Sequence, residues 1–152
     1  MLASGSPIAL EQIFELLTLY QKTGREQQFI EVARNLINQT QLPSQVILEM
    51  ARLASFPQPR FSFMAECLTK YLEKEPNNPD IWLELAAVYS AMNQQSQAIN
   101  ALKQAIQHGG EPFKEKIRND PRLQMLRNNE QFNRILTPPK MQKTKIPELI
   151  IP

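Results

Sequence analysis

The chain has 152 residues, a length that suits one domain of ordinary size. Hydrophobic residues make up 42% and charged residues 21%, which excludes a disordered chain, and no apolar run approaches the ~20 residues of a membrane-spanning helix. A net charge of +2 is too small to indicate nucleic-acid binding by itself, and a single cysteine, Cys67, excludes an internal disulfide.

The first residues have neither the basic flank nor the apolar core of a signal peptide. With no such leader and no membrane segment, the sequence favours a cytoplasmic protein, either whole or as a fragment of a larger one. We interpret residues 1–9 as an N-terminal leader or a vector-derived remnant, because Ser4-Gly5-Ser6 has the composition of a linker.

Apolar residues at three- and four-residue steps predict helices along the chain, separated by glycine and proline breaks. Gly24 is placed to end the first helix in a left-handed conformation, and Ser44 is a candidate N-cap for the third. Asn78-Pro79-Asp80 is a typical helix start. The expected helices cover about 8–19, 29–37, 46–54, 61–72, 80–92, 96–108, 112–117, 121–126 and 130–136. No stretch alternates like a strand, so we expect an all-α fold.

The helices return in pairs at a regular pitch. Units that start near Leu10, Gln45 and Pro79 are about 34 residues apart, which is the period of one kind of helical-hairpin repeat. The third unit has the most specific pattern: Trp82-x-x-Leu85-Ala86-x-x-Tyr89, then Ala98-x-x-x-Leu102, then Ala105.

This pattern resembles the tetratricopeptide repeat, with Ala86 where glycine is usual, Leu102 where an aromatic residue is usual, and Gly110 where the linking proline would be. The first two units resemble it more weakly. The second keeps the linking proline, Pro76, and the first keeps Tyr20 but lacks the small residue that follows.

The resemblance implies a right-handed α–α superhelix of about three helical hairpins with C-terminal capping helices. Residues 10–112 would form three tetratricopeptide-like helix pairs, residues 113–136 the capping helices, and residues 137–152 a proline-rich basic tail. Small residues would let paired helices approach closely, while bulky ones would fill the gaps between them. The small set is Ala86, Ala98 and Ala105, and the bulky set is Trp82, Leu85, Tyr89 and Leu102.

In tetratricopeptide arrays the first helix of each pair lines a concave groove, so the resemblance also implies where a ligand binds. Members that hold a terminal carboxylate there use basic residues and asparagine, whereas this groove carries acids. Apolar side chains mixed with acids favour an apolar or basic extended peptide. The predicted groove residues are Glu11, Phe14, Thr18, Glu49, Leu53, Phe56, Asp80, Leu83 and Ala87. The alternative is that the apolar residues pack against neighbouring helices and the acids are solvated.

The C-terminal part is basic, with nine basic residues and three acids between positions 114 and 145. The basic residues are Lys114, Lys116, Arg118, Arg122, Arg127, Arg134, Lys140, Lys143 and Lys145. Three interpretations stay open: a contact with nucleic acid or an acidic membrane, a solvated cap, or docking of the tail into the acidic groove of the same or a neighbouring molecule. The apolar end of the tail, Leu149-Ile150-Ile151, motivates the third, which includes self-association.

No motif indicates catalysis. His108, the only histidine, is expected in the last turn of a helix, where a cation suits the helix dipole, and Cys67 is expected to be buried. We expect no enzyme activity, no catalytic residue, no metal site, no cofactor and no small-molecule substrate. The sequence favours an adaptor or scaffold that binds a protein or peptide. The alternative function is an electrostatic adaptor whose basic C-terminal region binds an anionic membrane or, less favoured, nucleic acid.

Overall fold

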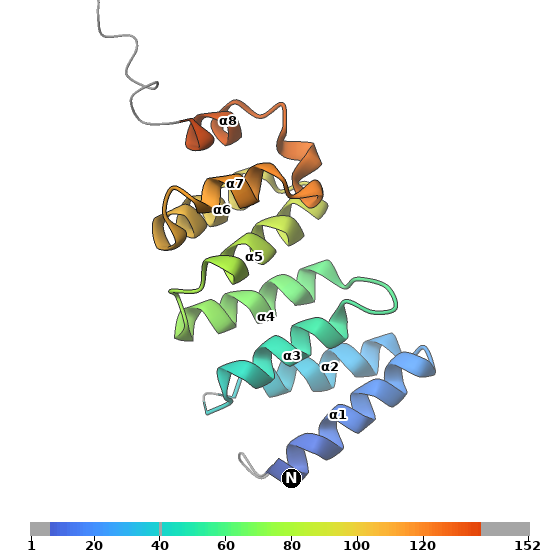
Figure 1. The fold of residues 1–152 in the computed structure, drawn as a ribbon. Coiled ribbons are helices and arrows are strands. Elements are labelled where there is room, and N and C mark those ends of the chain that lie inside the picture. Colours follow the sequence, from blue (N-terminus) through green and yellow to red (C-terminus); the bar gives the residue numbers. More distant parts are fainter. Residues whose placement is uncertain (1–6, 40, 138–152) are drawn as a thin grey trace, which may run out of the picture. The chain divides into compact units, whose positions relative to one another are not determined.

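A computed structural model describes residues 7–39 and 41–137, and in these ranges the chain forms helices only (Figure 1). The expected leader (1–9) and the expected proline-rich basic tail (137–152) fall largely outside these ranges. None of the helices described is both long enough and apolar enough to span a bilayer. The helices are α1 (Pro7–Lys22), α2 (Glu26–Ile37), α3 (Ser44–Ala54), α4 (Phe61–Lys74), α5 (Pro79–Ala91), α6 (Gln95–Gly109), α7 (Phe113–Arg118), the 3₁₀-helix η1 (Pro121–Leu126) and α8 (Glu130–Leu136).

The chain divides between Asn77 and Asn78 into two compact units. In the first, α1 pairs with α2, α3 pairs with α4, and α2 also packs on α4 (Figure 1). The rings of Phe29 and Phe63 meet edge to face across the α2–α4 contact, with centroids 6.5 Å apart. The Arg60 guanidinium lies over the Phe29 ring, 4.3 Å from the ring centroid, and forms an ion pair with Glu26. An ion pair therefore lies beside this aromatic contact.

Of the two helix ends predicted in the first unit, one is as expected and the other differs. Gly24 has a φ of 73°, so the predicted left-handed end of α1 is confirmed. The prediction that Ser44 caps α3 is wrong, because Pro43 occupies the N-cap position. The Ser44 hydroxyl instead lies 3.3 Å from the Glu75 carboxylate, beyond the end of α4, which is a competing partner that local sequence does not reveal.

In the second unit α5 and α6 form a hairpin with the expected small residues inside. Ala86, Ala98 and Ala105 are completely buried. Of the bulky residues, Leu85 and Leu102 are buried, whereas Trp82 and Tyr89 are only partly covered, which corrects the expectation that all four fill the core. Trp82 and Tyr89 are seven positions apart and therefore share one stripe of α5, and this stripe keeps some access to solvent.

The three short helices close the second unit. The 3₁₀-helix η1 packs on α5, while α7 and α8 pack on α6. Their apolar side chains Ile117, Leu123, Leu126 and Phe132 are almost fully buried. Asn129 caps α8 by accepting bonds from the backbone N–H groups of Gln131 and Phe132 at 2.8 and 3.1 Å. The segment thus covers apolar surface of the α5–α6 hairpin, which is what a repeat end needs.

Candidate functional site

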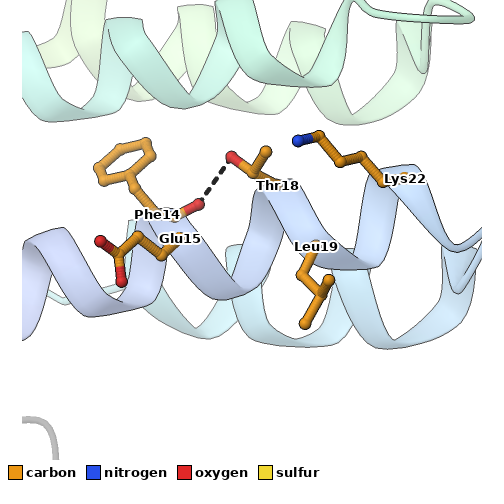
Figure 2. A pocket seen from close by; sticks show the side chains of 5 residues that line it. All are labelled: Phe14, Glu15, Thr18, Leu19 and Lys22. Atoms are coloured by element: carbon orange, nitrogen blue, oxygen red, sulfur yellow. Dashed lines mark hydrogen bonds between the residues drawn. The ribbon is translucent and has the colours of Figure 1, made fainter.

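One face of α1 carries an open depression of about 390 Å³ (Figure 2). Its walls are five side chains from successive turns of the helix: Phe14, Glu15, Thr18, Leu19 and Lys22. The Thr18 hydroxyl donates to the Phe14 carbonyl at 2.9 Å, so this hydroxyl is already bonded within the helix. Leu19 keeps 54% of its surface exposed, which gives the depression an apolar side chain available to a ligand.

A second exposed apolar residue lies after α3. Phe56 is 70% exposed, although the backbone around it is held by two side chains. The Gln21 amide nitrogen donates to the carbonyls of Leu53 and Phe56, and the Arg60 guanidinium donates to the Phe56 carbonyl at 3.2 Å. Because Gln21 lies at the end of α1, these bonds bring the exposed Phe56 next to the α1 face. We call Phe14, Thr18, Leu19, Leu53 and Phe56 the α1–α3 surface.

The acids predicted for the first unit differ in their partners. Glu49 pairs with Arg52 on the next turn of α3 at 3.0 Å, so its charge is partly neutralised. Glu11 is exposed and forms no ion pair with another described residue. Glu15 and Lys22, at the two ends of the depression, likewise form no ion pair within the described ranges.

The groove residues predicted on α5 lie in the other unit and have different surroundings. Leu83 is 3% exposed and Ala87 7%, so neither offers much surface to a ligand. The Asp80 carboxylate is paired with Lys116 of α7. The structure therefore places six of the predicted residues on exposed or partly exposed positions of α1, α3 and the turn after α3, and it places Leu83 and Ala87 in the interior.

The basic residues of the C-terminal part are largely used inside the second unit. Arg122 Nη1 donates to Glu84 at 2.8 Å, while its Nε and Nη2 donate to Asp120 at 3.0 and 2.7 Å. These bonds and the burial of the pair have opposite effects on the pKa of Asp120, and the bonds prevail, so that pKa lies below its ordinary value. Arg127 donates to the carbonyls of Arg118 and Asp120, at 2.7 and 3.1 Å. Lys140, Lys143 and Lys145 lie outside the described residues.

Cys67 and His108, the two residues that the sequence analysis considered for catalysis, lie where a structural role is expected of them. Cys67 is buried, as predicted, and burial raises the pKa of its thiol to about 12. His108 lies in the last turn of α6, also as predicted. Among the described residues, no three His, Cys, Asp or Glu side chains gather in a way that could hold a metal ion.

Sequence reasoning missed Glu15, Leu19 and Lys22 as parts of the site. A signal was present on α1: its buried stripe is formed by Ile13 and Leu17, yet Leu16 and Leu19 lie off that stripe. Apolar residues beyond the core stripe of a helix indicate either a further packing contact or an exposed apolar patch. No sequence pattern indicated the hydrogen bonds of Gln21, because its partners Leu53 and Phe56 lie 32 and 35 positions further along the chain.

The described fold defines an all-α protein built from antiparallel helical hairpins with a closed C-terminal end. Residues 67–100 match the family model described as Tetratricopeptide repeat, and the matched stretch runs from α4 through α5 into α6. The matched residues 67–100 are therefore similar to a tetratricopeptide repeat. A comparison with curated proteins gave no match. Repeats of this family generally mediate protein–protein interactions, and the family is typically non-catalytic.

Proposed function

We propose that this chain is a non-catalytic adaptor that binds an extended segment of a partner protein on the α1–α3 surface. The observation that supports this most is the exposed ring of Phe56, held on a fixed backbone beside the depression of α1. Aromatic side chains on a pre-organised backbone lose little entropy on binding and often supply most of the affinity of an interface. Phe56 and Leu19 would be the apolar anchors.

The partner segment that fits this surface carries a large apolar residue with a basic neighbour. Glu11 and Glu15 lie on α1 without a cation among the described residues, so they are available to a lysine or arginine of the ligand. Asp80 and Glu84 are already paired with Lys116 and Arg122. The proposed site is therefore confined to the first unit and does not include Leu83 and Ala87, which are buried in the second.

A phage-displayed library of random peptides, selected on the full chain, tests this proposal. We expect enrichment of peptides with a large apolar residue next to lysine or arginine. The double variant Leu19→Ser/Phe56→Ser should retain the helical circular dichroism but lose the selected phage. Met125→Ser is the matched control, because Met125 is 52% exposed on η1, outside the proposed surface. Failure to enrich any peptide, or equal capture by the double variant, would contradict the proposal.

We give the electrostatic alternative less weight. In the described part of the basic region, Arg118 and Arg127 hold carbonyl groups of the chain, and Lys116 and Arg122 pair with acids of α5. A cation that already has an internal partner contributes less to phosphate binding, since the existing bonds must first be exchanged. Binding of an oligonucleotide of about 20 nucleotides that weakens steeply between about 50 and 200 mM salt would restore this alternative.

A further inference from the structure

Lys22, the last residue of α1, is a cation at one end of the depression. Its side chain is exposed and forms neither a hydrogen bond nor an ion pair with another described residue. Figure 2 shows it on the same side of α1 as Phe14 and Thr18. The neighbouring residue Gln21 donates to the Phe56 carbonyl, so Lys22 lies at the end of the α1–α3 surface where Phe56 is held.

Glu11 is an acid at the other end of the same stripe of α1. It is also exposed and has no ion pair with a described residue. Eleven residues of α-helix make about three full turns and 20° more, so Glu11 and Lys22 leave the helix in nearly the same direction, about 16.5 Å apart along its axis. Phe14 lies between them and is partly exposed. The stripe therefore presents an acid, an aromatic ring and then a cation.

The position of Lys22 also has a purely structural explanation. A cation in the last turn of a helix interacts favourably with the helix dipole, so Lys22 would stabilise α1 without any ligand. This interaction leaves the N–H donors of the ammonium group without an acceptor among the described residues. The dipole interaction is therefore compatible with an anion bound at Lys22, and an experiment has to separate the two roles.

We infer that the partner segment carries an aspartate or glutamate side chain that pairs with Lys22, together with the base that pairs with Glu11. The inference rests on the proposed function and adds a spacing to it. An extended peptide advances about 3.3–3.6 Å per residue, so a base and an acid about five positions apart match the distance between Glu11 and Lys22. The large apolar residue next to the base then contacts Phe14. A segment with like charges at both ends meets repulsion at one of them.

The library-selected peptides test this spacing. We expect enrichment of an acid about four to six positions from the base. Displayed peptides are joined to the coat protein through their C-terminus, so an enriched acid is a side chain. One selected peptide, synthesised with an amidated C-terminus, should bind Lys22→Glu about five- to tenfold more weakly than the wild type at about 50 mM salt. Lys103→Glu is the matched control, because it makes the same charge change on an exposed lysine of α6 in the second unit.

A charge exchange identifies the pair. Replacing the acid of the peptide by lysine should weaken its binding to the wild type and strengthen its binding to Lys22→Glu, so the two changes together cost less than their sum. A dipole role for Lys22 would lower the urea midpoint of the variant but would not depend on the charge of the peptide. Equal binding of the acidic peptide to Lys22→Glu and Lys103→Glu overturns the inference, and so does a charge exchange that restores no binding.

The two proposals fail differently. If peptides are selected and are lost in Leu19→Ser/Phe56→Ser, but carry no acid at this spacing, the adaptor function stands and the inference about Lys22 is wrong. Binding that requires a free C-terminal carboxylate or a phosphorylated residue also contradicts the inference and leaves the adaptor function in place. If no peptide is selected, the adaptor proposal is wrong and the inference falls with it.

Discussion

Arg122 of η1 donates to Glu84 of α5 at 2.8 Å and, through two other nitrogen atoms, to the buried carboxylate of Asp120. One guanidinium therefore ties the closing segment to the repeat hairpin and also neutralises an acid that is 8% exposed. A carboxylate with so little access to water needs such a partner, because an unpaired buried charge is costly.

Arg122→Ala should lower the free energy of unfolding by about 1–2 kcal/mol, a range reduced to allow for the partial exposure of Arg122. Urea unfolding followed by circular dichroism measures the loss. Arg52→Ala is the control, because its ion pair with Glu49 joins two side chains that are 60% and 55% exposed, and it should change stability by less than about 0.5 kcal/mol. Equal effects of the two substitutions would show that the Arg122 bonds do not hold the segment.

Asp120 should make stability depend on pH in the acidic range. Its pKa in the folded state is lowered from the ordinary value of 3.8, chiefly by the Arg122 hydrogen bonds. A lowered folded pKa adds stability that is present above pH 3.8 and is lost as the pH falls through the folded pKa. The difference in urea midpoint between the wild type and Asp120→Asn should therefore be largest at neutral pH and shrink below about pH 4. A difference that stays constant down to about pH 2.5 would exclude this linkage.

We expect alanine substitution of two aromatic residues in the second unit to lower stability by different amounts. Phe132→Ala should destabilise by about 3–5 kcal/mol, because the ring is fully buried among the closing helices. Trp82→Ala should cost less, since the indole is only partly covered. Thermal unfolding followed by circular dichroism compares them, and a larger loss for Trp82→Ala would mean that its stripe is buried in solution.

Gly24→Ala should lower stability by about 1–2 kcal/mol, because an L side chain is strained at a φ of 73°. No atom lies within 4 Å of the added methyl group, so the backbone alone would cause the loss. Gly24→Asn should cost less, as asparagine tolerates this conformation better than alanine. Urea midpoints for the two variants test the order, and an alanine variant as stable as the wild type would contradict it.

Much of the fold could be predicted from sequence because it depends on local patterns. Helical periodicity located all the described helices, and Ala86, Ala98 and Ala105 indicated where two helices approach closely. The contact of Arg122 with Glu84 could not be predicted, since the two residues are 38 positions apart and nothing local distinguishes one exposed acid of α5 from another.

The candidate site was predicted less completely for the same reason. Phe14 and Phe56 were predicted because the first helix of each repeat is expected to line the groove. The depression is also lined by Leu19 and Lys22, which this expectation did not include. Leu83 and Ala87 occupy the expected face of α5, yet they are buried, because burial depends on the surroundings of a helix and not on its own periodicity.

The affinity of a library-selected peptide for single-residue variants tests the central claim most directly. Calorimetric titration of the wild type, Phe56→Ser and Met125→Ser gives the dissociation constant of each. We predict that Phe56→Ser weakens binding about tenfold or more, in line with the loss of an aromatic anchor, while Met125→Ser leaves the affinity unchanged. Equal affinities for all three proteins would contradict the claim that the α1–α3 surface is where this protein binds its partner.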